Sequence, residues 1–148
     1  MKKILFVCHG NICRSVMAEF IMKHLVNEAG RAAEFYIDSA AVSTEETGND
    51  IYPPAKRKLT EKGVPFSSHA ARQISVSDYR YFDYIVLMDK SNQRLMRYLV
   101  GDDTEGKVSL LLDWAGLNRD VADPWYTGDF ETAYQDILLG CKALMNNL

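Results

Sequence analysis

The hydrophobic pattern alternates between short continuous apolar runs and longer segments of helical period. The apolar runs predict strands at residues 4–7, 34–38, 82–88 and 107–111. The first run, Ile4-Leu5-Phe6-Val7, contains no polar residue, which is typical of a strand buried on both faces. The run at 82–88 is the clearest strand of the four.

Each predicted strand is followed by a segment of helical period. The first helix closes at Ala29-Gly30, and the second begins at Pro53 and Pro54, which the first turn of a helix tolerates, and runs to residue 63. Asp89 is the expected N-cap of a third helix that runs to about residue 98, and Asp129 caps the last helix. The apolar stripe of the last helix comprises Phe130, Tyr134, Ile137, Leu138, Cys141, Leu144 and Met145.

Strands that alternate with helices indicate an α/β fold, with a parallel sheet covered by helices on both faces. A chain of 148 residues has the commonest size for one domain, and it contains no internal repeat or linker, so we expect a single domain over residues 1–148. Ligands of such sheets bind beyond the carboxyl ends of the strands. The segment that follows residue 7 is therefore expected at the ligand-binding edge.

Composition and charge exclude several classes of protein. A hydrophobic fraction of 47% with a net charge of −3 excludes a disordered chain, and 17 basic against 20 acidic residues give no bulk positive field for nucleic acid. No apolar run is long enough to span a membrane. The first apolar run is also too short for a secretory signal and lacks a small-residue cleavage site, so we expect a cytoplasmic protein.

The chain has three cysteines, Cys8, Cys13 and Cys141. An odd count argues against a disulfide scaffold, and the cysteines and the three histidines have no zinc-site spacing. Thiol chemistry or buried packing remains. Cys141 lies on the apolar stripe of the last helix, so we expect it in the core.

The segment between the first strand and the first helix has the features of an anion site. Gly10 and Asn11 belong to the residue types that most readily adopt positive φ, and a short loop entering a helix directs its backbone N–H groups inward. The planar guanidinium of Arg14 can bind two phosphate oxygens. Cys8 lies where the positive field of Arg14 and the backbone N–H groups would hold it as a thiolate. The segment reads Cys8-His9-Gly10-Asn11-Ile12-Cys13-Arg14-Ser15.

This segment resembles the signature of the low-molecular-weight protein tyrosine phosphatases, and the resemblance extends over nearly the whole chain. A Cys and an Arg separated by five residues occur in several unrelated phosphatase folds, but this position near the N-terminus combined with a distant Asp-Pro is specific to the family. The resemblance implies three layers around a four-stranded parallel sheet of order 2-1-3-4, a flavodoxin-like fold. Further matching segments are Asp38-Ser39, His69-Ala70-Ala71-Arg72-Gln73, Phe82-Asp83-Tyr84 through Met88-Asp89, and Asp123-Pro124.

The resemblance also implies a role for each catalytic side chain. Cys8 is the nucleophile that carries the phosphoryl group as a cysteinyl-phosphate, and Arg14 binds the equatorial oxygens. Asp123 protonates the leaving phenol oxygen and then activates water; from the residues alone it would be only a turn aspartate before proline. The reaction needs no metal or other cofactor.

A second set of residues is implied to shape the loop. The backbone amides of residues 9–15 cradle the phosphate, and His9 contributes only its amide. Asp89 is expected to orient His69. Cys13 is implied to form a protective disulfide with Cys8, although a small packing residue is the competing interpretation. The residues implied to hold the loop in shape are Asn11, Ser15, Ser39, His69 and Asp89.

The walls of the cleft depart from the family pattern. Trp125 and Tyr126 follow the Asp-Pro, where the family usually has two tyrosines, and they could stack on a phenyl ring. Glu45, followed by Glu46, stands where the family often has an aromatic residue on the opposite wall. We therefore expect a shallower and more acidic cleft that repels acidic phosphopeptides.

Three other functions compete with a tyrosine phosphatase. An arsenate reductase of the same fold needs two relay cysteines, and residues 56–96 contain none. A silent phosphate-binding or redox-sensing module would need neither a thiolate nor an acid, and a sugar-transport phosphocarrier would not need Asp123. The expected substrate is a phosphotyrosine protein or a small aryl phosphate. The family implies a tyrosine kinase as a candidate partner, and we expect a monomer or weak dimer.

Overall fold

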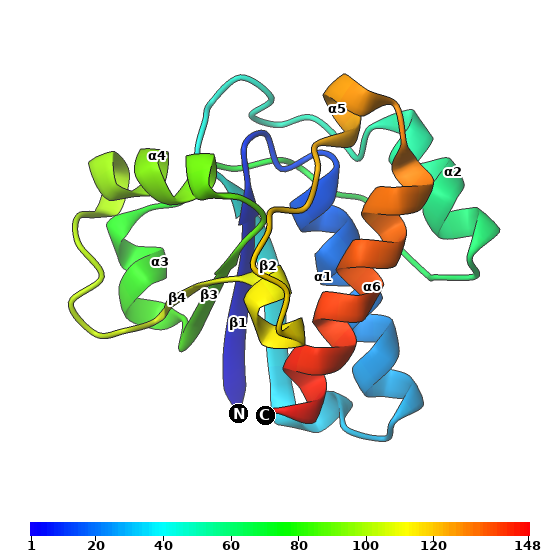
Figure 1. Cartoon of the computed structure of the whole chain (residues 1–148), viewed down its shortest axis with the longest axis horizontal. Coiled ribbons are helices and arrows are strands. Elements are labelled where there is room, and N and C mark those ends of the chain that lie inside the picture. Colours follow the sequence, from blue (N-terminus) through cyan, green and yellow to red (C-terminus); the bar gives the residue numbers. More distant parts are fainter.

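The computed structural model describes residues 1–148 and contains one four-stranded parallel sheet. The strands are β1 (Lys2–Cys8), β2 (Phe35–Ala41), β3 (Tyr84–Leu87) and β4 (Val108–Leu110), in the order β2-β1-β3-β4 (Figure 1). All three strand pairs are parallel. The predicted α/β class and strand order are confirmed.

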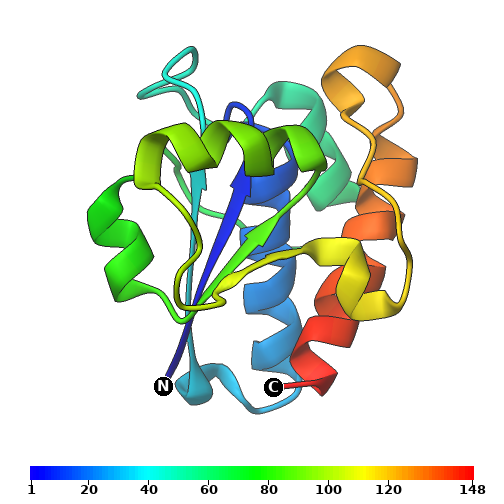
Figure 2. The ribbon, with the colours of Figure 1, turned by 60° about the vertical axis from the view of Figure 1, so that its left-hand side comes forward.

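Helices cover both faces of the sheet, as Figures 1 and 2 show. On one side are α1 (Arg14–Glu28), α2 (Pro53–Glu61) and α6 (Phe130–Asn146), and on the other are α3 (Val76–Tyr81) and α4 (Lys90–Val100). Ile4 and Phe6 of β1 belong to the core beneath α1 and α6, whereas Leu5 and Val7 belong to the core beneath α3 and α4. β1 is therefore buried on both faces, as its apolar run predicts.

The predicted caps are correct, and two short helices were not predicted. Asp89 accepts a hydrogen bond from the Asn92 amide at the start of α4, and Asp129 accepts one from the Thr132 amide at the start of α6. The unpredicted helices are α3 and α5 (Pro124–Thr127). α5 begins at Asp123, whose carboxylate accepts a hydrogen bond from the backbone amide of residue 125.

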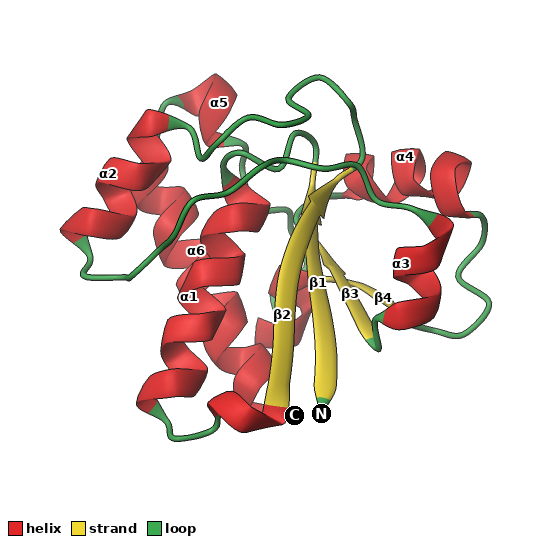
Figure 3. Cartoon of the chain, turned by 180° about the vertical axis from the view of Figure 1, so that it is seen from behind, coloured by secondary structure: helices red, strands yellow, loops and turns green.

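Two connections set the position of the site. The chain after α2 passes over the carboxyl end of β2, where the Ala41 amide donates to the carbonyl of Arg72 (Figure 3). The chain after β4 forms a 3-10 turn, η2 (Leu111–Ala115), which packs against α6. At that contact Gly140 faces the side chain of Leu111, and a Cβ atom at residue 140 would overlap it.

None of the helices combines the length and the hydrophobicity that a membrane-spanning helix needs.

Candidate active site

The candidate site is the loop between the end of β1 and the start of α1, at the carboxyl edge of the sheet (Figure 1). α1 has no side-chain cap at its N-terminus, so its first amides are not satisfied by a capping residue. Asn11 is the one non-glycine residue with a positive φ, at 60°. This turn allows the amides of the loop to point inward, which produces a concave anion site.

The sulfur of Cys8 lies at the centre of this loop and is 3% exposed. The Asn11 amide donates to it at 3.3 Å and the Ser15 amide at 3.4 Å, and the Ser15 hydroxyl oxygen lies 3.0 Å away. The Cys8 sulfur is therefore the point on which the donors of the loop converge.

The side chain of Asn11 joins the loop to β2. Its amide nitrogen donates to the Ser15 hydroxyl at 2.8 Å and to the Ser39 hydroxyl at 2.9 Å. Ser39 in turn donates to the Glu19 carboxylate at 2.6 Å. Asn11, Ser15 and Ser39 are all essentially inaccessible to water, so each bond is protected from competition by solvent. The structure brings these predicted supports together as expected.

The segment after α2 holds the backbone of Asn11 from the other side. The ring nitrogen Nε2 of His69 lies 2.7 Å from the Asn11 carbonyl oxygen, and the Arg72 amide donates to the Asn11 side-chain oxygen at 3.3 Å. Every polar group of Asn11 is thus used to fix the strained turn. His69 supports the loop as predicted, through this carbonyl.

The guanidinium of Arg14 is 2% exposed and is held by three partners. Nη1 donates to Asp89 at 2.7 Å and to the Val121 carbonyl at 2.8 Å, and Nη2 donates to Asp123 at 3.3 Å. Burial opposes the charge of Arg14, but the nearby charges of Cys8, Asp123 and Asp89 outweigh it and raise its pKa. Arg14 therefore stays charged. The Nε and Nη2 side of its guanidinium remains available to donate to an anion.

The expected pairing of Asp89 with His69 is wrong. The Asp89 carboxylate accepts from Arg14 through one oxygen and from the Asn92 amide through the other, and neither oxygen bonds His69. His69 meets the Asn11 carbonyl instead. The physical reason is charge: the buried guanidinium of Arg14 needs a carboxylate partner, and Asp89 provides it. Asp89 supports the site by holding Arg14.

The general-acid candidate Asp123 lies between α5 and the loop. One carboxylate oxygen caps α5 through the Trp125 amide at 3.0 Å, and the other contacts Arg14. The cap fixes the carboxylate at the mouth of the site. Asp123 therefore lines the same cleft as Cys8 and Arg14.

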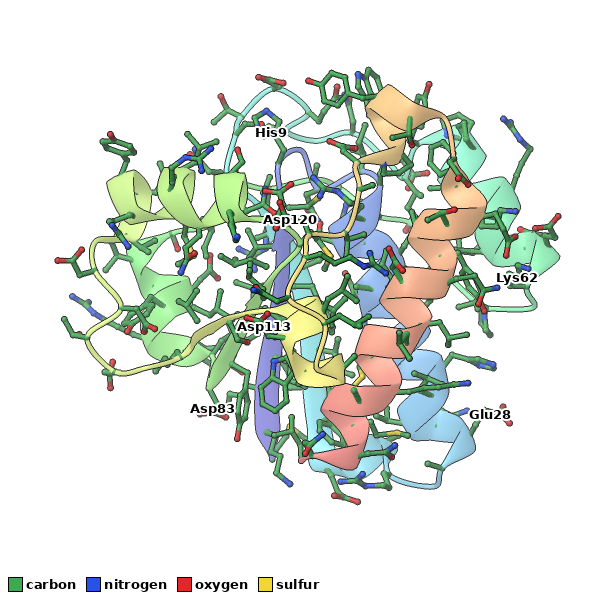
Figure 4. All side chains as sticks on the ribbon, viewed as in Figure 1. His9, Glu28, Lys62, Asp83, Asp113 and Asp120 are labelled. Atoms are coloured by element: carbon green, nitrogen blue, oxygen red, sulfur yellow. The ribbon has the colours of Figure 1, made fainter.

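The rim of the cleft is exposed and mixed in character. Tyr126 is 84% exposed, while the Trp125 ring lies 4.8 Å from the ring of Tyr52 and is half exposed. On the opposite wall the Glu45 carboxylate pairs with the His9 ring at 3.3 Å. Figure 4 shows His9 below the loop that carries Glu45. The cleft encloses about 110 Å³ and is lined by Cys8, His9, Gly10, Asn11, Ile12, Cys13, Arg14, Glu45, Glu46, Asp123, Trp125 and Tyr126.

The two remaining cysteines are free and buried. Burial raises the pKa of Cys13, and the neighbouring charges of Cys8 and Asp123 raise it further. Burial alone raises the pKa of Cys141, which is fully enclosed in the core as predicted. No cluster of His, Cys, Asp or Glu side chains could hold a metal ion.

Three contributors to the site were not predicted. Glu19 accepts from Ser39, Glu46 lines the cleft, and the Val121 carbonyl accepts from Arg14. The sequence does carry a signal for Glu19, because a carboxylate in the apolar stretch 16–22 must find a buried partner. The carbonyl of Val121 carries no such signal, since any residue type supplies one.

Comparison with known proteins identifies the family. The family model described as low molecular weight phosphotyrosine protein phosphatase matches residues 3–148. The low molecular weight protein-tyrosine-phosphatase YfkJ of Bacillus subtilis is 37% identical over 100% of this chain and 96% of its own, and the human low molecular weight phosphotyrosine protein phosphatase is 38% identical over 97% and 94%.

Solved structures agree with the sequence matches. The crystal structure of YfkJ superposes with a TM-score of 0.95 at 38% identity, covering 99% of this chain and 94% of that one. The structure titled as DARP, a drosophila arginine phosphatase, superposes with a TM-score of 0.89 at 34% identity, covering 99% and 97%. The fold, the Cys-loop-Arg geometry and these matches lead to one conclusion. The chain belongs to the low molecular weight phosphotyrosine protein phosphatase family and is a protein tyrosine phosphatase, a phosphoric monoester hydrolase.

Proposed function

We propose that Cys8, Arg14 and Asp123 carry the two steps of phosphate-ester hydrolysis. In the first step the Cys8 thiolate attacks phosphorus, the P–O bond to the phenol breaks, and Asp123 gives its proton to the departing oxygen. In the second step Asp123 takes a proton from water, the water oxygen attacks phosphorus, and the P–S bond breaks. Inorganic phosphate leaves and the thiolate is restored.

Arg14 is proposed to stabilise the transferring phosphoryl group. Its Nη1 is already fixed by Asp89 and Val121, so the guanidinium is oriented before any substrate arrives. A preorganised fork acts on charge that spreads over the equatorial oxygens in the transition state. The amides of residues 9–15 supply further donors to the same oxygens.

Ser15 is proposed to assist the departure of the sulfur in the second step. Its hydroxyl oxygen accepts a hydrogen bond from the Asn11 amide group, which leaves the hydroxyl proton free to donate toward Cys8 at 3.0 Å. A donor on the sulfur stabilises the thiolate as it leaves phosphorus. Asn11 would thus act through Ser15 as a positioning residue.

One observation carries this assignment: a single sulfur receives two loop amides and contacts the Ser15 hydroxyl, beside a fixed guanidinium and a partly exposed carboxylate. The test measures p-nitrophenyl phosphate and phenyl phosphate hydrolysis with a metal chelator present. We expect Cys8→Ser to lose activity by at least about 10⁴-fold, and Cys13→Ser, in the same loop, to keep most of it.

Asp123→Ala tests the acid. It should lower the rate on phenyl phosphate by about 10² to 10⁴-fold and lower it less on p-nitrophenyl phosphate, whose leaving group needs little protonation. Asp113→Ala on the same connection is the matched control, because its carboxylate is exposed on η2. An Asp123 variant with equal losses on both substrates would refute the role of proton donor.

Glu45 at the rim favours one alternative phosphoryl donor. A carboxylate facing the cleft suits a substrate whose leaving group is cationic, and a structural relative is titled an arginine phosphatase. The discriminating assay compares kcat/KM for phosphotyrosine and phosphoarginine in the same peptide. We propose phosphotyrosine proteins and small aryl phosphates as the preferred substrates, and a higher value for phosphoarginine would reverse that order.

We also propose how the loop responds to oxidation, where in the cell the enzyme works and which partners it has. A nucleophilic thiol needs a reducing compartment, which supports a cytoplasmic location, with a tyrosine kinase as the candidate source of substrate. Cys13 is proposed to trap oxidised Cys8 as a disulfide, whereas Cys141 is too deeply buried to relay it onward as an arsenate reductase would require. Light scattering would test the expectation of a monomer or weak dimer.

A further inference from the structure

A second groove lies away from the catalytic loop, between α1, β2 and residues 65–67. It encloses about 720 Å³, within the usual range of about 300–1,000 Å³ for small-molecule sites. Figure 3 shows α1 beside β2 on this face, with the chain that follows α2 passing across them. Its lining includes Phe20, Lys23, Phe35, Asp38 and Phe66.

The lining combines aromatic rings with a cationic group. Phe20 and Phe66 lie with ring centroids 6.4 Å apart in an edge-to-face arrangement, and Lys23 Nζ sits 5.1 Å from the Phe20 centroid. Lys2 and Arg31 lie outside the lining, 5.6 and 5.2 Å from the Phe35 centroid, and Arg31 is paired with Glu34. Rings of this kind bind a flat aromatic body, and the Lys23 ammonium of the lining attracts a negative charge.

The carboxylate in the groove is bonded to groups outside it, so it leaves the Lys23 ammonium as the charged group that faces a ligand. Asp38, the one acidic residue of the lining, already accepts from Arg72 at 3.2 Å and from the Ser39 amide at 2.8 Å. Lys23 is 45% exposed at its side chain and can reach a ligand. The chemistry of the groove therefore fits a small aromatic carboxylate.

Lys23 also begins a chain of contacts that ends at the nucleophile. Its ammonium donates to Glu19 at 2.6 Å, and the other oxygen of Glu19 accepts from Ser39 at 2.6 Å. Ser39 accepts from Asn11, whose amide group also donates to Ser15 beside Cys8. Glu19 is buried, so its charge depends on Lys23 and Ser39 for compensation.

We propose that this groove binds an aromatic carboxylate and that its occupancy is transmitted to the catalytic loop through Lys23 and Glu19. A bound carboxylate competes with Glu19 for the Lys23 ammonium. Glu19 then relies more on Ser39, and the Ser39 hydroxyl sets the position of the Asn11 amide group. Binding to the groove is independent of the proposed catalytic roles, whereas transmission rests on them.

Binding is tested with 2-naphthoate as the probe and neutral 2-naphthamide as its isostere. Backbone amide shifts of the labelled full-length protein are followed by NMR, with inorganic phosphate saturating the catalytic loop. We expect shifts at residues 20–27, 35–38 and 66–67, and a dissociation constant for naphthoate that is about threefold lower than that for naphthamide. Phe66→Ala should weaken both ligands by about tenfold.

Lys23→Gln is the decisive binding variant. It should abolish the preference for naphthoate over naphthamide, while Lys142→Gln, an exposed lysine on α6, should leave it intact. Shifts confined to the catalytic loop, or a preference that survives Lys23→Gln, would overturn the proposed site. A folded spectrum of each variant excludes loss of structure as the cause.

Transmission is tested by kinetics without added phosphate. We expect naphthoate to lower kcat for p-nitrophenyl phosphate about twofold to fivefold with little change in KM, because the contact of Ser15 with the sulfur is affected and the rim of the cleft is not. Glu19→Gln keeps the acceptor for Ser39 but removes the charge that Lys23 balances, so naphthoate should still bind and no longer change kcat. An increase in KM alone would mean competition at the catalytic cleft and would overturn the transmission.

Discussion

The floor and the rim of the cleft are built in opposite ways. On the floor, Asn11 and Arg14 are buried, and their polar groups are matched by partners from four separate segments of the chain. On the rim, Glu45 and Tyr126 are exposed, and Glu45 has only a half-exposed His9 as a partner. The floor is fixed by the fold, while the rim is free to vary with the substrate.

The difference separates two tasks of a phosphatase. Every phosphate ester presents the same phosphoryl group, so the groups that meet it gain from being rigid before the substrate binds. Leaving groups differ between substrates, and the residues that meet them lie on exposed positions that tolerate substitution. Variants on the floor should therefore change kcat, and variants on the rim should change KM.

Among the variants that compare the floor with the rim, Arg14→Lys should have the largest effect. Lysine keeps the positive charge but loses the planar fork that reaches Asp89, Val121 and the substrate together. We expect kcat on aryl phosphates to fall by about 10³-fold with a smaller change in KM. A variant with near-normal kcat would mean that charge alone, without a fixed fork, supports the reaction.

The two cysteines of the floor should differ in reactivity. The raised pKa of Cys13 keeps its proton at pH 9, where an ordinary thiol with a pKa of 9.0 would be half ionised. Iodoacetamide at pH 9 should therefore label Cys13 at least about tenfold more slowly than it labels Cys8. Mass spectrometry of the labelled loop peptide measures both sites, and labelling in urea, where the two thiols should react alike, is the control.

The raised pKa of Cys13 also makes the stability of the protein depend on pH. Above pH 9 the unfolded chain releases the Cys13 proton while the native protein keeps it, so the unfolded state binds fewer protons. The free energy of unfolding should then fall as the pH rises above 9. Cys13→Ala should reduce this slope in urea titrations, and an unchanged slope would contradict the assignment.

Asn11→Ala should have an intermediate effect, and it should lower both kcat and the stability of the fold. It removes the donors to Ser15 and Ser39 and places alanine at a φ of 60°. We expect kcat to fall about tenfold and the free energy of unfolding to fall by about 1–3 kcal/mol. Denaturant titration alongside kinetics measures both, and Asn49→Ala on the exposed rim loop is a control that should change neither.

The smallest effect is expected on the rim. Glu45→Trp restores an aromatic wall opposite Trp125 and removes a negative charge beside an anion site. KM for an aryl phosphate should fall about threefold with kcat unchanged, and Glu45→Gln separates the loss of charge from the gain of a ring. An unchanged KM in both variants would refute the assignment of residue 45 to the wall.

The fold could be predicted because its signals are local. Apolar runs and caps such as Asp89 and Asp129 determine the strands and helices within a few residues. The missed helix α3 also carries a local signal, since Ser75 and Asp78 form a capping box. Asp123 followed by Pro124 likewise has the form of a helix N-terminus, which the turn interpretation overlooked.

The partners within the site could not be predicted in the same way. Arg14 and Asp89 are 75 residues apart, and their contact depends on how far α4 lies from α1 across the sheet. The loop and the reactive Cys8 could be predicted from the local residues, whereas the acid was identified only through the family resemblance, which also led to the wrong partner for Asp89. Packing between distant segments decides which buried charge a carboxylate pairs with, and no single segment of the sequence encodes that packing.

The contact between Gly140 and Leu111 has a consequence far from the helix on which it lies. Leu111 belongs to η2, and the chain leaving η2 carries both the Val121 carbonyl, which holds Arg14, and Asp123. Any side chain at residue 140 would push η2 away from α6 and loosen that connection. Gly140→Ala should therefore behave as a temperature-sensitive allele: the enzyme works in the cold, loses the position of its proposed general acid on warming and regains it on cooling.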